Sequence, residues 1–151
     1  MRKIIFVVAA LLALSAFGAD NPLAGVWKLN TAKSHFSHGN LPVSLVLTIE
    51  ADGPNGIKYS SKNQLVNGTS GGASYAAKFD GKDYPVNGSG SYDHVSIRRV
   101  NPRTFHVQMK KGEAVIVDMN YTVAADGKSL TRKGTHAPPD ENQFDEWFDR
   151  Q

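Results

Sequence analysis

Short stretches in which apolar and polar residues alternate are the feature that most constrains the fold of this chain. Residues 103–111 and 113–124 both carry apolar side chains at every second position. Because successive side chains of a strand point to opposite faces, a period of two indicates half-buried antiparallel strands. Turn-forming pairs separate such stretches, for example at 67–68, 80–81 and 87–88. The pattern therefore predicts short strands joined by tight turns.

The stretches predict eight strands and a possible ninth at the C-terminus. They are expected near 24–30, 43–51, 56–66, 73–79, 92–100, 103–111, 113–124 and 128–136. With no long helix between them, an all-β antiparallel up-and-down barrel of about eight or nine strands is expected, because closure removes exposed edges. A barrel of this size has room inside for side chains or one small ligand. We expect one domain over 20–151, with a two-sheet Greek-key sandwich as the alternative.

The C-terminal stretch 140–151 fits two structures. Asp140 could cap a short helix, and Phe144, Trp147 and Phe148 follow at helical spacing. The same residues could instead form the last strand, which would pair with the first strand and close the barrel. Periodicity alone favours the helix slightly.

The N-terminus has the pattern of a secretory signal. Arg2 and Lys3 precede an apolar run of eleven residues, which is too short to span a membrane, and small residues follow it. We expect a signal peptide over 1–18, with cleavage after Gly18 or Ala19, and a periplasmic or secreted product without a membrane segment. Its removal lowers the formal net charge from +3 to +1, since 15 basic and 14 acidic residues remain. With no run of basic residues left, no nucleic-acid partner is expected.

Enzyme motifs are missing from the sequence. There is no cysteine, so thiolate chemistry and disulfides are excluded, and no nucleophile elbow, phosphate loop, dinucleotide fingerprint or His-Glu-x-x-His occurs. We expect no catalysis and no cofactor. His35 and His38 could share a metal with a third ligand such as Asp20, Asp140 or Glu141. The simpler interpretation is a polar loop with solvated histidines, and no metal site is predicted.

Polar residues on apolar strand faces point to a ligand. If Val95 and Ile97 face the interior, Arg99 does too, and Leu130 places Arg132 on the inner face in the same way. A buried guanidinium needs a partner, and a ligand carboxylate bound through two N–H donors would serve. Alternatively, the two arginines lie over the rim with their heads in water, or one stacks on Trp27.

The predicted ligand-binding set combines these arginines with aromatic and methionine side chains on inner faces. Its members are Arg99, Arg132, Tyr59, Tyr75, Phe79, Phe105, Met109, Met119 and Tyr121.

Three segments resemble a known group of proteins. The first runs from Gly25-Val26-Trp27 to Ser37, the second is 76–88, and the third is 148–151. They resemble small exported bacterial proteins described as lipocalin-like, a calycin-type set without an assigned activity. The resemblance implies a barrel, a tryptophan that closes one end of it, and a C-terminal strand in place of the helix. The two prolines in 137–142 depart from the family's Gly-containing turn and weigh against pairing of that last strand.

Two main hypotheses for function follow. The first is an exported, monomeric, non-catalytic protein that holds a small hydrophobic or amphiphilic molecule, for example a fatty acid with its carboxylate on an arginine. The alternative is a protein-binding module or inhibitor with a packed interior, acting through loops such as 31–42 and 67–72. A metal enzyme built on His35 and His38 is the third.

Overall fold

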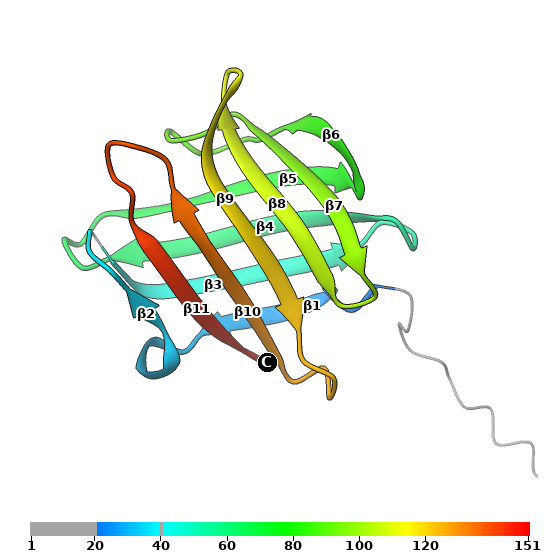
Figure 1. The fold of residues 1–151 in the computed structure, drawn as a ribbon. Coiled ribbons are helices and arrows are strands. Elements are labelled where there is room, and N and C mark those ends of the chain that lie inside the picture. Colours follow the sequence, from blue (N-terminus) through cyan, green and yellow to red (C-terminus); the bar gives the residue numbers. More distant parts are fainter. Residues whose placement is uncertain (1–20, 40) are drawn as a thin grey trace, which may run out of the picture.

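The computed structural model describes residues 21–39 and 41–151, which form a β-barrel (Figure 1). The predicted signal peptide and its cleavage sites lie outside the described residues. The elements are β1 (Gly25–Leu29), η1 (Thr31–Lys33), β2 (His35–Phe36), β3 (Pro42–Ala51), β4 (Gly56–Leu65), β5 (Ser70–Lys78), β6 (Asp80–Pro85), β7 (His94–Asn101), β8 (Thr104–Lys111), β9 (Ala114–Val123), β10 (Ser129–His136) and β11 (Gln143–Arg150).

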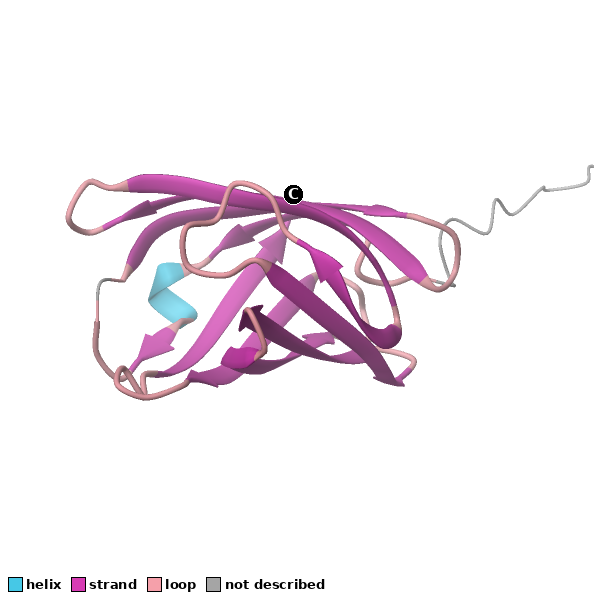
Figure 2. Cartoon of the chain, turned by 90° about the horizontal axis from the view of Figure 1, so that it is seen from above, coloured by secondary structure: helices cyan, strands magenta, loops and turns pink. Residues whose placement is uncertain are grey.

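The strands follow one antiparallel path, in the order β5-β4-β3-β1-β11-β10-β9-β8-β7-β6. The first and last strands of the chain meet where Trp27 pairs with Arg150. The two ends of the path approach each other through Ser74 and Asn87, which exchange two backbone hydrogen bonds of 2.9 Å. Figure 2 shows the wall curving from one layer of strands into the other. The predicted all-β antiparallel barrel is therefore confirmed, in a nearly closed form.

Residues 21–39 and 41–151 contain more strands than predicted, eleven in place of eight or nine. The two-residue β2 pairs with β11 and is too short to show a period. Strand β6 begins at the pair 80–81, which was expected to form a turn; its residues are mostly polar, and Gly81 has a φ of +74°. The register of β6 against β7 shifts between Asp80 and Asp83, so alternation is lost there although the strand exists.

The C-terminal stretch is a strand, so the slight preference for a helix was wrong. Strand β11 pairs with β10 over seven residues, among them Phe148 opposite Leu130, and with β1 on its other side. The two prolines lie in the loop before it, which closes where the His136 N–H donates to the Asn142 carbonyl oxygen at 2.9 Å. Both edges of β11 are paired, so its main-chain groups form hydrogen bonds with two neighbouring strands. These bonds stabilise the strand more than the packing of three apolar side chains would stabilise a short helix.

The inner face of the barrel is apolar along most of its strands. The alternation predicted for 103–111 and 113–124 is confirmed, since Val107 and Tyr121 are fully buried while the polar neighbours of each are more exposed. The largest fully buried side chains are Trp27, Tyr121, Phe105, Phe148, Leu23, Leu47, Ile57, Ile97 and Leu130. Together they form one continuous core.

Trp27 closes one end of the barrel, which we call the Trp27 end. Its side chain is fully buried, and its indole N–H donates to the Leu23 carbonyl oxygen at 2.8 Å. The Arg150 guanidinium lies 4.0 Å from the indole ring centre and donates to the carbonyl oxygens of Ala24 and Gly127. The arginine that stacks on Trp27 is therefore Arg150, and neither Arg99 nor Arg132 has this role. Gly25 has a φ of +148°, which residues with a side chain rarely adopt, and a Cβ there would displace that guanidinium, so glycine suits the position two residues before Trp27.

The opposite end of the barrel carries five loops, and we call it the loop end. These segments connect strands or follow β2, and they cover 37–39, 66–69, 86–93, 112–113 and 137–142. No helix in the described residues is long and apolar enough to cross a membrane.

Candidate ligand-binding interior

An ion pair lies inside the barrel. Arg132 on β10 is directly opposite Glu146 on β11, and its Nε–H donates to Glu146 Oε2 at 2.7 Å. The guanidinium Nη2 is 2.5 Å from the same oxygen, and the two side chains are only 9% and 7% exposed. Nη1 donates to the Tyr121 hydroxyl at 3.3 Å. The prediction that a buried guanidinium needs a partner holds, and the protein itself supplies a carboxylate.

Aromatic rings enclose this arginine. Its guanidinium carbon lies 5.0 Å from the centre of the Phe148 ring and 5.5 Å from that of Tyr121. Burial by itself lowers the pKa of Arg132. The Glu146 carboxylate and the phenols of Tyr121 and Tyr59 raise it by more, so the pKa lies well above its usual value. The group is therefore a permanent cation balanced by Glu146.

Three more tyrosines share this interior. Tyr59 and Tyr75, opposite each other on β4 and β5, stack with ring centres 4.5 Å apart and an angle of 11° between the planes. Tyr92 comes from the loop between β6 and β7 and is half-buried. Burial raises the pKa of Tyr75 well above its usual value, and the neighbouring phenols of Tyr121, Tyr59 and Tyr92 raise it further. Because these groups act on one another electrostatically, they form one interior assembly.

We call this assembly the polar cluster. Its members are Tyr59, Tyr75, Tyr92, Tyr121, Arg132 and Glu146.

The Tyr75 hydroxyl stands out within the polar cluster. The residue is 5% exposed, and its hydroxyl oxygen has no hydrogen-bond partner among the described residues. Nearer the loop end on β4, the buried Oδ1 of Asn63 also has no donor among the described residues. Buried polar groups in folded proteins are nearly always hydrogen-bonded, since an unmade bond costs about 1–3 kcal/mol. These two atoms are therefore candidate contact points for a bound molecule.

The structure brings part of the predicted set together. Tyr59, Tyr75, Tyr121 and Arg132 belong to the polar cluster. Met109 and Met119 are buried on β8 and β9, in register with Val95 and Gly134.

The remaining three predicted residues form a second group beside the polar cluster, since Phe105 lies opposite Tyr121 in the register of β8 and β9 and opposite Arg99 in that of β7 and β8. Phe79 and Phe105 pack at 4.8 Å between ring centres, with Arg99 5.3 Å from the centre of the Phe105 ring. Arg99 is half-buried, and its Nη2 donates to the Pro102 carbonyl oxygen at 3.0 Å.

Two members of the polar cluster, Glu146 and Tyr92, were not predicted. Glu146 lies on the same face as Phe144 and Phe148 once 143–150 is a strand, so a period of two in the tail was the signal that could have revealed it. A helical spacing hides this relation. Tyr92 was expected to begin the strand 92–100, but β7 begins at His94, and Tyr92 lies in the loop before it, where alternation does not indicate the direction of a side chain.

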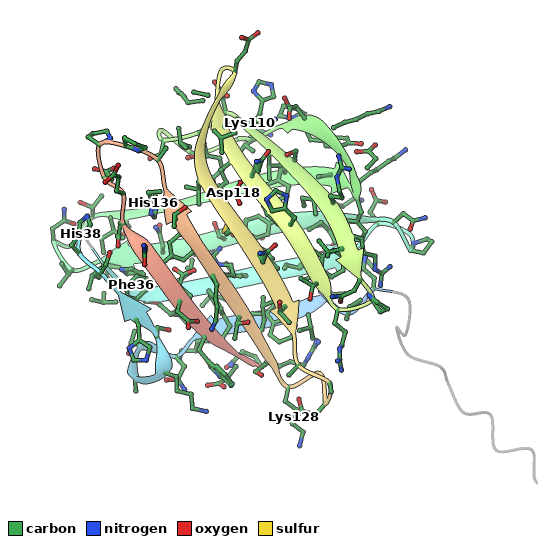
Figure 3. The ribbon with its side chains drawn as sticks, in the orientation of Figure 1. Phe36, His38, Lys110, Asp118, Lys128 and His136 are labelled. Atoms are coloured by element: carbon green, nitrogen blue, oxygen red, sulfur yellow. The ribbon has the colours of Figure 1, made fainter. Side chains whose placement is uncertain are left out.

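The histidine segment does not form a metal cluster with described residues. His35 is on β2 opposite Asp145, while His38 Nε2 is 2.5 Å from the Asp140 backbone carbonyl oxygen. Figure 3 shows Phe36 on β2, at the side of the barrel, and His38 just beyond it. Within 21–39 and 41–151, no three His, Asp or Glu side chains gather as metal ligands would. Asp20, one proposed third ligand, lies outside the described residues.

A polar groove lies on the outer face of β6, β7 and β8. It has a volume of about 240 Å³ and is lined by Gly81, Ser96, Arg98, His106 and Gln108. Asp118, labelled on the strands in front in Figure 3, accepts hydrogen bonds of 2.9 Å from Gln108 and is 2.9 Å from His106 Nε2. None of the predicted ligand-binding residues lines this groove, because all of them were chosen from inner faces.

Comparison with known proteins supports the fold. No protein-family model matches the sequence, and no curated protein matches it. Among solved structures, a redesigned β-barrel, b11L5F_LGL, matches with a TM-score of 0.55 and 12% identity over 88% of this chain and 95% of that chain. A second redesigned barrel, mFAP1 bound to DFHBI, also has a TM-score of 0.55, with 10% identity over 87% of this chain and 98% of that one.

A natural protein gives a similar result. The amine binding protein of Rhodnius prolixus, in its tryptamine complex, has a TM-score of 0.52 and 14% identity over 89% of this chain and 66% of that chain. At such low identity the likeness extends to the fold alone. It supports an antiparallel β-barrel.

We expect the tyrosines of this chain to resist ionisation in the folded state. Burial raises the pKa of Tyr59, Tyr75, Tyr92 and Tyr121, and a hydrogen bond to the Asp80 carboxylate raises that of Tyr84. In a spectrophotometric titration at 295 nm, the native protein should form little tyrosinate near pH 10.5, whereas the chain in guanidinium should titrate near its ordinary pKa of about 10.

The same shifts predict a loss of stability in alkali. The folded state favours the neutral phenol, so this contribution is fully present below a pH of about 10 and is lost as the pH rises above it. Native and denatured titration curves that coincide would contradict both expectations.

Proposed function

We propose that this chain is an exported, monomeric, non-catalytic binding protein whose barrel holds a small hydrophobic or amphiphilic molecule. The observation that carries the proposal is the Tyr75 hydroxyl, which is buried in the barrel interior without a partner among the described residues. A protein whose interior served packing alone would place an apolar ring there, since phenylalanine fills nearly the same space without an unmade hydrogen bond.

Three further features support the proposal. The inner face next to the polar cluster carries adaptable and aromatic side chains, such as Met109, Met119 and Phe105, which suit the apolar part of a ligand. Two of the barrels similar in fold have a small molecule, DFHBI or tryptamine, in their structures. The signal pattern in 1–18 and the resemblance to small exported bacterial lipocalin-like proteins support export.

Binding can be tested with a neutral hydrophobic probe. N-phenyl-1-naphthylamine should bind the purified protein at about one molecule per chain, with increased and blue-shifted emission that disappears in guanidinium. Organic extraction of protein purified from its own cells, followed by mass spectrometry, should release one class of small molecule reproducibly. A protein that yields no such molecule and does not bind the probe contradicts the proposal and favours the loop-mediated partner. Export predicts an N-terminus at Ala19 or Asp20 in the purified product.

A further inference from the structure

We propose that the ligand is an uncharged, elongated molecule whose buried end carries a hydrogen-bond acceptor for the Tyr75 hydroxyl. This inference rests on the proposed function and adds the chemical class of the ligand. Stacking on Tyr59 with nearly parallel planes holds the ring of Tyr75 in place. A phenol is protonated at physiological pH, so the Tyr75 hydroxyl can act as a donor. A carbonyl or ether oxygen is the kind of group that this donor lacks.

The charge balance of the polar cluster indicates that the acceptor is neutral. Both Nε and Nη2 of Arg132 contact Glu146, and Nη1 contacts the Tyr121 hydroxyl. The positive charge is thus already compensated by a carboxylate that is itself buried. A ligand carboxylate beside Tyr75 would give the interior a net negative charge, because the arginine is already neutralised, and it would lose its hydration, which is costly in an apolar interior.

A buried ammonium group is disfavoured by the same pair. Its natural counter-ion would be Glu146, whose Oε2 already takes two contacts from Arg132. A neutral ligand keeps the pair intact and forms the one hydrogen bond that Tyr75 needs.

The shape of the ligand follows from the small side chains between Tyr75 and the loop end. Beyond the Tyr59–Tyr75 pair, Ser61 lies opposite Ala73 and Asn63 lies opposite Gly71. From Tyr75 to Gly71 is four residues, or about 13 Å along the strand. These small side chains are not a site on their own, but they lead from the unpartnered phenol towards the unpartnered Asn63 Oδ1. A molecule of this length would contact both atoms.

Three naphthalene probes with the same ring system test this inference. They are 6-propionyl-2-dimethylaminonaphthalene, which has a ketone acceptor, its 6-carboxylate analogue, and 2-dimethylaminonaphthalene, which has no acceptor at that position. We expect the wild-type protein to bind the ketone at least ten-fold more tightly than the carboxylate. The Tyr75→Phe variant should lose about ten-fold in affinity for the ketone and nothing for the probe without an acceptor.

Two controls make the result specific. Tyr84→Phe removes a phenol oxygen that already donates to Asp80 at 2.7 Å, and it should leave the affinity for all three probes unchanged. Thermal melting of Tyr75→Phe should match or exceed that of the wild type, because a hydroxyl without a partner is removed. Equal ketone binding by Tyr75→Phe and wild type, or tighter binding of the carboxylate, overturns the inference while leaving the proposed function intact. Binding of none of the three probes overturns both.

Discussion

Replacing Glu146 by alanine should lower the free energy of unfolding by about 4 kcal/mol, among the largest effects expected for any single substitution in this barrel. The variant leaves the Arg132 guanidinium in an interior where its side chain is 9% exposed and no other carboxylate contacts it in the described residues. Burial disfavours a charge without a counter-ion, and an arginine cannot shed its proton to escape. Urea unfolding followed by circular dichroism measures the loss.

The same two strands provide a matched control. Lys133 and Asp145 are the next pair along β10 and β11 and form an ion pair of 2.9 Å on the outer face, with side chains 64% and 38% exposed. Asp145→Ala should cost less than about 1 kcal/mol, because water screens this pair. The double variant Arg132→Met, Glu146→Leu should recover most of the stability lost in Glu146→Ala, since no buried charge remains. A loss for Glu146→Ala no greater than for Asp145→Ala would contradict the buried ion pair.

Replacing Trp27 by alanine should also cost about 4 kcal/mol. The substitution removes a fully buried indole, leaves the Leu23 carbonyl oxygen without its donor, and takes away the ring over which Arg150 lies at 4.0 Å. Each of these losses falls at the point where the N-terminal segment meets the last strand. Denaturant unfolding measures the effect, and the Trp27 end should become accessible to proteases first.

Trp147 is the matched control for the same deletion, because it is the only other tryptophan in the sequence. It lies on the outer face of β11, is half-buried, and contacts the Lys33 ammonium at 4.8 Å from the ring centre. Trp147→Ala should therefore cost clearly less, about 1–2 kcal/mol. Equal losses for the two tryptophans would show that Trp27 does not close the barrel as described.

Much of the fold could be predicted from the sequence, because a half-buried strand records its environment in its alternation. Phe105, Val107 and Met109 were assigned to an inner face on this basis, and all three are buried. The same rule placed Arg132 inside from its spacing to Leu130. Strand β6 escaped the rule, since its shifted register and mostly polar residues carry no period of two.

The composition of the candidate site was predictable only in part. Tyr59, Tyr75, Tyr121 and Arg132 stand on strands with clear periodicity, so their direction could be deduced. Glu146 could not be assigned before its segment was known to be a strand, because Phe144 and Phe148 are also compatible with one helical face.

The amino-acid sequence by itself determined the architecture and the direction of most side chains. Alternation and turn formation depend only on residues a few positions apart in the chain, so both can be recognised in the sequence. Only the tertiary structure decided which inward groups meet across the barrel. It paired Arg132 with Glu146, placed Arg150 over Trp27, and left the hydroxyl of Tyr75 without a protein partner among the described residues. Such contacts depend on the register between strands that lie far apart in the chain, and local patterns do not encode that register.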